Sequence, residues 1–251
     1  MIRKQKDAIE WLEFELLSDI PALSHGVFLR HGGICTGPYK SLSVGRANEE
    51  SDLDEVAENL SRIKSILNID HLLSGHQMHG KGIALVDAPR SQIPNCDALL
   101  TCRSDLGLMI RHADCQAAIF YDPIHHALAT VHCGWRGNVQ NIYSAVVTAM
   151  QRHFSSRTEN ILVGISPSLG LEHAEFIHFR AELPEEFWPY QIKPTYFDLW
   201  SIAKMQLETA GILPHHIEIA SICTYANEED FFSFRRDKRV TGNHATVAVL
   251  R

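Results

Sequence analysis

The stretch LGLMIRHADCQAAIFYDPIHHALATVHCGWRGN, residues 106–138, decides most of the fold. It contains three short apolar runs with strand character, at 106–111, 117–121 and 127–132. The turn DPIHH separates the last two runs, which predicts a β-hairpin. GWRG follows the third run, and a helix is predicted to begin near Asn138, so the chain passes here from sheet to helix.

The rest of the chain shows the same mixture of elements. Apolar runs predict further strands at 25–30, 82–86, 97–101, 160–165, 217–223 and 245–250. Helical periodicity predicts helices from the capping residues Ser51 and Asp52 to about Leu67, from Asn138 to about Phe154, and over about 198–210. Interspersed strands and helices favour an α/β or α+β fold with mixed β-sheet layers flanked by helices.

The length of 251 residues fits one large domain as well as two small ones. No internal repeat, low-complexity segment or Pro/Ser-rich linker divides the sequence. We therefore expect a single domain over residues 25–251, with residues 1–24 as an N-terminal extension packed on it.

Composition excludes several classes of protein. Apolar residues make up 45% and charged residues 21% of the chain, which is ordinary for a globular protein. The net charge of −7 disfavours nucleic acid as a partner, and no apolar run is long enough for a membrane span. The start MIRKQKDAIEWLEFELL is interrupted by acidic residues and argues against a secretory signal. Six cysteines without a CxxC motif predict free thiols in the cytoplasm.

The chemistry is expected around the end of the strand at 127–132. GWRG lies at a helix N-terminus, where free N–H groups favour an anion, and Arg136 adds a permanently charged planar fork. The alternative is that Arg136 pairs with a structural carboxylate.

The sequence contains 15 histidines, and histidine is the commonest metal ligand. A hairpin would bring His132 close to Cys115, and His79 lies in the loop HQMHGKG. One cysteine with two histidines is a catalytic zinc set that leaves a fourth position open. Cysteine with histidine is equally a nucleophile and its base, and a lone cysteine at a strand end is often only a small buried apolar residue. The spacing alone leaves these alternatives open.

Six motifs occur in order along the chain: GHQMHG (75–80), CDALLT (96–101), RHADC (111–115), VHCGWRGN (131–138), SPSLG (166–170) and FFSFRRD (231–237). Together they resemble the laccase-domain, or YfiH-like, family over about residues 25–250. Members of that family carry names such as polyphenol oxidase, purine nucleoside phosphorylase and peptidoglycan editing factor. The resemblance implies two packed β-layers flanked by helices, similar to the catalytic domain of cytotoxic necrotizing toxins.

The resemblance also implies a metal site made by His79, Cys115 and His132, holding zinc, with copper as the alternative. Other positions depart from the family pattern. Ser43 stands in place of an asparagine that could contact substrate, and Asn243 in place of an arginine. The paired cysteines of the family are replaced within 170–175.

The implied function is that of a zinc-dependent purine nucleoside enzyme. It would catalyse phosphorolysis of adenosine, inosine or guanosine, with methylthioadenosine as a further substrate, and deamination of adenosine. Arg136, Arg235 and Arg236 are the expected phosphate-binding residues, and Ser43 is an expected substrate contact. The partners are then small molecules, a purine nucleoside and phosphate, without nucleic acid or membrane.

Two other functions use the same residues. In a cysteine amidase that edits peptidoglycan precursors, Cys115 would be the nucleophile and His132 its base, without metal. A copper-dependent polyphenol oxidase is less favoured, because a multicopper centre needs many imidazoles and no two histidines here are separated by one residue.

Overall fold

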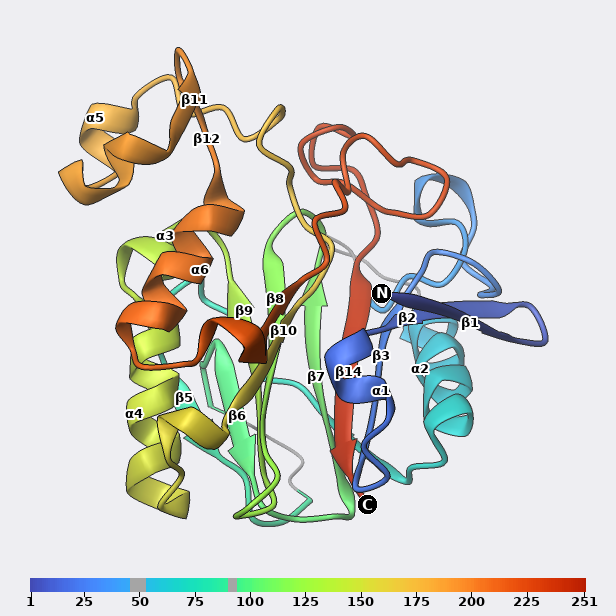
Figure 1. Ribbon diagram of the computed structural model, residues 1–251. Coiled ribbons are helices and arrows are strands. Elements are labelled where there is room, and N and C mark those ends of the chain that lie inside the picture. Colours follow the sequence, from blue (N-terminus) through green and yellow to red (C-terminus); the bar gives the residue numbers. More distant parts are fainter. Residues whose placement is uncertain (46–52, 90–93) are drawn as a thin grey trace.

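The computed structural model describes residues 1–45, 53–89 and 94–251, and two six-stranded sheets form its middle (Figure 1). The first sheet has, in spatial order, the strands β1 (Ile2–Lys6), β2 (Ile9–Glu13), β3 (Leu23–Phe28), β14 (His244–Leu250), β7 (Leu106–His112) and β4 (His71–Leu73). The second has β13 (Ile217–Ile219), β10 (Leu162–Ile165), β8 (Gln116–Asp122), β9 (Ala127–Cys133), β6 (Ala98–Thr101) and β5 (Ile83–Leu85). Antiparallel neighbours predominate, with one or two parallel pairs in each sheet, so the predicted mixed-sheet fold is confirmed.

The two sheets share a core because side chains alternate along each strand. Leu108 of β7 and Ile119 of β8 point between the sheets and belong to one buried cluster. The next residue of β7, Met109, points to the opposite face and packs with α2 (Leu53–Leu67). Both faces of the central strands are therefore apolar, which explains their uninterrupted apolar sequence.

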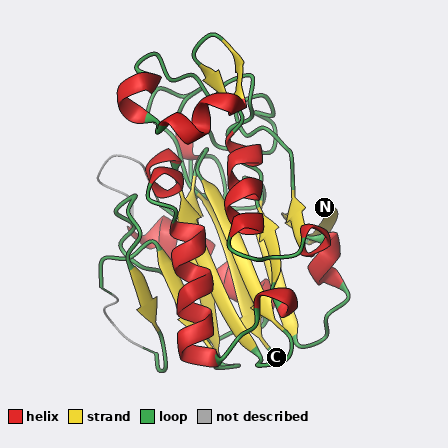
Figure 2. Cartoon of the chain, turned by 60° about the vertical axis from the view of Figure 1, so that its left-hand side comes forward, coloured by secondary structure: helices red, strands yellow, loops and turns green. Residues whose placement is uncertain are grey.

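Helices cover the outer faces of both sheets (Figures 1 and 2). Ile63 of α2 packs against the first sheet. Two helices, α4 (Ile142–Phe154) and α6 (Leu199–Thr209), cover the second sheet, with Val146 and Leu207 in the shared cluster. The result is a helix–sheet–sheet–helix arrangement. No helix of the described ranges has the length and apolar character to cross a bilayer.

The helix predicted from Asn138 to Phe154 is two helices in the structure, which corrects the prediction. The first, α3 (Trp135–Val139), already begins at Trp135, and Asn138 is buried inside it. Asn141 then adopts a left-handed conformation with φ of 52° and caps α4 by accepting a hydrogen bond from the backbone N–H of Ser144. Asparagine tolerates this conformation and is a preferred cap, so the helical pattern is interrupted there.

Other differences lie at short elements. The strand predicted at 217–223 is shorter, and the predicted caps Ser51 and Asp52 lie outside the described residues. Sequence patterns did not predict β1, β2, β4, the helices α1 (Glu15–Ser18) and α5 (Phe179–Glu182), or the hairpin of β11 (Gln191–Lys193) and β12 (Tyr196–Phe197). Each spans five residues or fewer, too few for a clear period.

Candidate active site

His79, Cys115 and His132 meet at one end of the two sheets. One potential ligand atom from each side chain lies within 4.8 Å of the other two. Cys115 comes directly before β8 and His132 is near the end of β9, and these strands form the predicted hairpin, with Ala117 opposite His132. His79 comes from the loop between β4 and β5.

The three side chains differ in their access to solvent. His132 is buried, Cys115 is half-buried and His79 is exposed. The imidazole rings of the two histidines stand at 89° with centroids 4.7 Å apart. The cluster is therefore open on the side of His79, where a ligand can reach it.

Asp97, directly before β6, connects the two histidines. Its Oδ1 lies 2.8 Å from Nδ1 of His132 and accepts a hydrogen bond of 2.9 Å from the backbone N–H of His79. Its Oδ2 accepts from the backbone N–H groups of Met78 and Gly80. Since Asp97 engages Nδ1 of His132, Nε2 is the nitrogen left for a metal or for Cys115. Asp97 belongs to the motif CDALLT, but no local pattern in the sequence predicts this role.

The buried charges at the cluster stabilise one another. Burial by itself would raise the pKa of Cys115, but the positive charge and hydrogen bond of His132, with help from His79, lower it to about 6. Burial would likewise lower the pKa of His132, but the Cys115 thiolate and the Asp97 carboxylate raise it to about 9. Hydrogen bonds from His132 and the loop hold the pKa of Asp97 below its usual value despite its burial.

Asp114, next to Cys115, fastens a second loop to the cluster. It has a φ of 82° and accepts hydrogen bonds from the hydroxyls of Thr224 and Ser233 and from the backbone N–H of Arg235. Burial raises the pKa of Asp114 although these bonds oppose the shift. The loop that leads into β14 is thereby held at the same end of the sheets as the cluster (Figure 1).

A cavity of about 1110 Å³ opens over the three side chains. Among the described residues its walls include five cationic side chains and one carboxylate, that of Asp114, although the whole chain has a net charge of −7. The cations are Arg111, Arg136, Arg235, Lys238 and Arg239. Aromatic rings of Trp135, Phe176 and Phe234 also line it. Such a cavity suits an anionic ligand with a flat apolar part.

The structure brings two of the four predicted substrate residues to this cavity. Arg136 lines it with its guanidinium carbon 4.6 Å from the centre of the Trp135 ring, and Arg235 lines it while donating to the backbone oxygen of Glu175. His112 lines it too, with Nε2 2.8 Å from the hydroxyl of Thr246.

The other two, Ser43 and Arg236, are not among the residues that line the cavity. Ser43 is fully buried, and its hydroxyl donates to the backbone oxygen of Gly45 and accepts from the N–H of Asn243. The Arg236 guanidinium donates to the side chain of Asp237 and to three backbone oxygens, those of Thr224, Tyr225 and Phe231. Both side chains are occupied in holding loops together.

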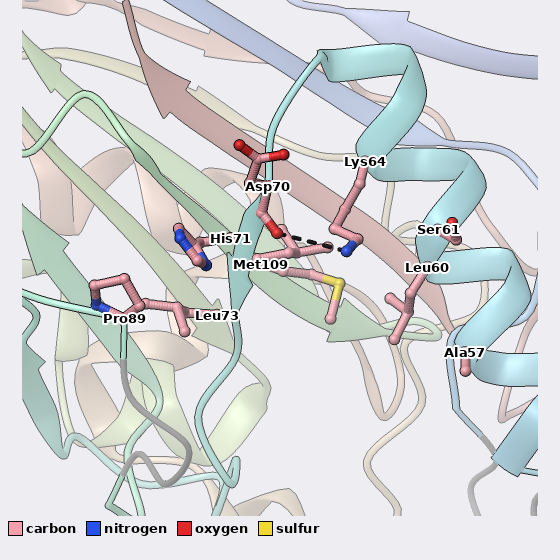
Figure 3. Close-up of a pocket in the computed structure, with 10 residues that line it drawn as sticks. Ala57, Leu60, Ser61, Lys64, Asp70, His71, Leu73, Pro89 and Met109 are labelled. Atoms are coloured by element: carbon pink, nitrogen blue, oxygen red, sulfur yellow. Dashed lines mark hydrogen bonds between the residues drawn. The ribbon is translucent and has the colours of Figure 1, made fainter.

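A second pocket, of about 510 Å³, lies between α2 and β4, away from the cluster (Figure 3). Leu60 and Lys64 of α2 face His71 and Asp70 there, and Lys64 Nζ lies 3.5 Å from the backbone oxygen of Asp70. Its walls contain one imidazole and no thiol. This pocket therefore has no donor set comparable with the cluster.

Two facing mixed sheets with a His–Cys–His cluster at one end define a laccase-domain, or YfiH-like, protein. The chain belongs to the family described as multi-copper polyphenol oxidoreductase laccase, whose model matches residues 24–251. The family resemblance inferred from the six motifs is thereby confirmed.

Relatives of similar length carry the name of a nucleoside enzyme. The chain is 28% identical to a purine nucleoside phosphorylase of Bacteroides thetaiotaomicron, over 94% of each protein. It is 31% identical to purine nucleoside phosphorylase ORF3 of Streptomyces griseus, over 86% of this chain and 89% of the relative. Among solved structures, YlmD from Geobacillus stearothermophilus superimposes with a TM-score of 0.88 at 26% identity, covering 100% of this chain and 99% of that one.

The donor set fits a metal ion. Two imidazole nitrogens and a thiolate are ligands that zinc accepts, with a fourth position left for a small molecule. A separation of at most 4.8 Å lets small side-chain rotations bring the three atoms to bonds of about 2.0–2.3 Å. The soft thiolate and the imidazoles are also acceptable to copper.

Proposed function

We propose that this chain is a zinc-dependent purine nucleoside enzyme. It phosphorolyses adenosine, inosine and guanosine, with methylthioadenosine as a further substrate, and it deaminates adenosine. The observation that carries the proposal is the meeting of His79, Cys115 and His132 beneath a cationic cavity with aromatic walls. The names of the relatives support phosphorolysis as the reaction class.

In this proposal His79, Cys115 and His132 hold the zinc ion. When bound, the ion supplies a Lewis acid that brings the pKa of a water molecule to roughly 7, which suits attack at C6 of adenine. Asp97 keeps the ring of His132 in one tautomer and orientation and fixes the loop that carries His79.

Other side chains in the cavity walls are suited to bind the purine ring and the phosphate. Trp135 and Phe176, whose ring centres are 5.9 Å apart at 74°, offer apolar faces for a purine. Arg136 and Arg235 are two of the cations that the cavity walls offer to an anion such as phosphate. Phosphorolysis needs both ligands at once, and a cavity of about 1110 Å³ has room for a nucleoside beside phosphate.

Turnover of a nucleoside panel with and without inorganic phosphate tests the proposal. The protein should be purified without a metal-affinity tag, and its zinc content measured first. We expect about one zinc per chain, free base and ribose 1-phosphate only when phosphate is present, and inosine from adenosine without phosphate. Failure of the zinc-loaded protein to convert any of these nucleosides would overturn it.

One observation favours a second candidate, a metal-free cysteine amidase that acts on peptidoglycan precursors. Cys115, His132 and Asp97 form a line of nucleophile, base and orienting carboxylate, and the pKa of Cys115 is lowered to about 6. The test is hydrolysis of a peptidoglycan-derived peptide amide by protein stripped of metal. Amide hydrolysis that survives complete zinc removal, with no nucleoside turnover, would favour this candidate.

A copper-dependent polyphenol oxidase is the weakest of the three. Reduction of dioxygen to water takes four electrons, which multicopper enzymes store at several copper ions. In the described ranges, His79, Cys115 and His132 form the single group of three or more metal-binding side chains. One such site supplies too few donors for that chemistry.

A further inference from the structure

Arg111 is a cationic residue of the cavity to which the sequence analysis gave no role. It is the next-to-last residue of β7, two positions after Met109, so both side chains point to the outer face of the first sheet. Asn243, directly before β14, and Gly45 lie beside it. All three line the large cavity.

The guanidinium of Arg111 has little to compensate its charge. Among the described residues its head group makes one hydrogen bond, of 3.3 Å, to the backbone oxygen of Gly75, and no ion pair. Other arginines differ: Arg3, for example, binds the carboxylates of both Glu10 and Asp230. Burial lowers the pKa of Arg111. A half-buried cation without a counter-ion is unfavourable, and an anionic ligand would remove that cost.

Arg111 reaches the large cavity next to Asn243 and Gly45. A Cβ atom on Gly45 would lie 3.3 Å from Nδ2 of Asn243 and 3.6 Å from Cδ of Arg111, so the backbone at Gly45 lies close to both side chains and a larger residue there would press on them. The Asn243 amide adds a neutral donor, and Lys238 adds a further positive charge to the same cavity.

Among the residues that the structure describes, no carboxylate in the cavity lining pairs with Arg111. Within the described ranges Asp114 is the one carboxylate that lines the cavity, and its two oxygens already accept from Thr224, Ser233 and the backbone of Arg235. The described residues on the Arg111 side of the cavity therefore present a positive charge and an amide without a carboxylate paired to them.

The cavity has two chemically different sides. Trp135, Phe176 and Leu199 belong to the layer over the second sheet, where they pack in one aromatic-rich cluster. Arg111 belongs to β7 of the first sheet, and Asn243 directly precedes β14 of the same sheet. Cys115, in the link from β7 to β8, lies where the chain crosses from one sheet to the other. Arg136 stacks on Trp135 and brings one cation to the aromatic side. A purine bound against that side would leave the Arg111 side of the cavity for the phosphate.

We propose that Arg111 and Asn243 form a phosphate subsite, in which they bind the phosphate that attacks the ribose. The subsite rests on the proposed phosphorolysis. In that reaction a phosphate oxygen bonds to C1′ of the ribose as the C1′–N9 bond breaks. The bonding electron pair leaves with the purine, which takes up the proton of hydrogen phosphate, and the products are ribose 1-phosphate and the free base.

The variant Arg111→Gln tests the subsite, with Arg152→Gln, on the exposed end of α4, as the matched control. Loss of a charge-assisted contact should raise the KM for phosphate in inosine phosphorolysis roughly ten- to hundredfold. Zinc content and the phosphate-independent deamination of adenosine should stay within about twofold, and Arg111→Lys should recover part of the loss. The control should match the wild type throughout.

A purely structural role of Arg111, through Gly75 and the loop that carries His79, makes a different prediction. Deamination and phosphorolysis would then fall together, or zinc would be lost, and either result would overturn the subsite. A phosphate KM in Arg111→Gln within about twofold of the wild type would overturn it as well.

Direct binding of inorganic phosphate separates this proposal from the proposed function. If the wild type binds phosphate, Arg111→Gln does not, and no nucleoside is phosphorolysed, the subsite stands and the phosphorylase assignment fails. If the wild type binds no phosphate, the subsite is wrong. A third outcome is that binding of a nucleoside 5′-monophosphate depends on Arg111 while binding of inorganic phosphate does not. Arg111 would then recognise a phosphate ester, which also overturns the proposal.

Discussion

Asp97 accepts a hydrogen bond from Nδ1 of His132 at 2.8 Å while its other contacts fix the loop of His79. One buried carboxylate thus orients two side chains that come from segments more than fifty residues apart. Partners of this kind set the tautomer and direction of a metal-binding imidazole. The geometry of the cluster therefore depends on a residue outside it.

Replacement of Asp97 by asparagine should weaken zinc binding roughly 10–100-fold. The amide keeps the size of the side chain but lacks the negative charge that stabilises the His132 ring. Its NH₂ group also cannot accept a hydrogen bond, so either His132 or the backbone N–H groups of the loop lose an acceptor. Competition with a chelator of known affinity measures the effect. Zinc affinity within about twofold of the wild type would show that Asp97 does not act through the metal site.

The chain offers a matched control at the far end of the same hairpin. Asp122 is fully buried and its Oδ2 lies 2.8 Å from Nδ1 of His125, much as Asp97 meets His132. Asp122→Asn should lower stability and leave zinc affinity unchanged, because this pair lies outside the metal-binding cluster. Equal losses of zinc in both variants would mean that general destabilisation explains the result.

Replacement of Arg236 by methionine should lower the stability of the fold by about 2–4 kcal/mol. Its guanidinium satisfies backbone oxygens of Thr224, Tyr225 and Phe231, which would lose their donor. Thermal unfolding measures the change. Arg235→Met is the comparison, because Arg235 is exposed, and it should unfold close to the wild-type temperature. A variant of Arg236 that keeps full stability but loses phosphate affinity would return this residue to the substrate site.

All six cysteines should titrate as thiols in the freshly prepared, denatured and unreduced protein. They all lie in the described part of the chain, and no disulfide joins any two of them. A thiol reagent added in denaturant counts them. Four or fewer reactive groups would contradict the prediction.

The sequence predicted the fold class because the central strands are apolar on both faces. In 106–138 the three runs, the DPIHH turn and GWRG each have a local signature, and the structure follows them closely. Cys115 and His132 could be paired because a hairpin dictates their proximity. His79 had no such constraint, and only the resemblance to a family joined it to the other two.

The remaining features depend on tertiary contacts that local patterns do not encode. Asp97 reads as an ordinary polar residue before a buried strand, and its partner His132 is far away in the sequence. The sequence does not distinguish the roles of the adjacent residues Arg235 and Arg236. In the structure Arg235 lines the cavity, whereas the guanidinium of Arg236 donates to backbone oxygens. Arg111 was read as the end of an apolar run, and its exposure to the cavity follows from where the first sheet ends.

Replacement of Cys115 by serine distinguishes the zinc enzyme from the amidase. A serine hydroxyl is a poor zinc ligand at neutral pH, so zinc affinity should fall by roughly a hundredfold or more, beyond the loss expected for an orienting residue. Phosphorolysis and deamination should disappear with the metal. The fold should persist, because the buried clusters of a chain of 251 residues do not depend on one ion.

The exposed thiol supplies the control for that experiment, since Cys102→Ser should keep zinc and both activities. If zinc-free wild-type protein hydrolyses the peptide amide and the Cys115→Ser variant does not, the thiolate acts as a nucleophile. The amidase then becomes the better proposal. If Cys115→Ser retains most of its nucleoside turnover, neither mechanism holds. Zinc content, nucleoside turnover and amide hydrolysis, measured on the same three proteins, therefore decide between the two proposals because each predicts a different combination of losses.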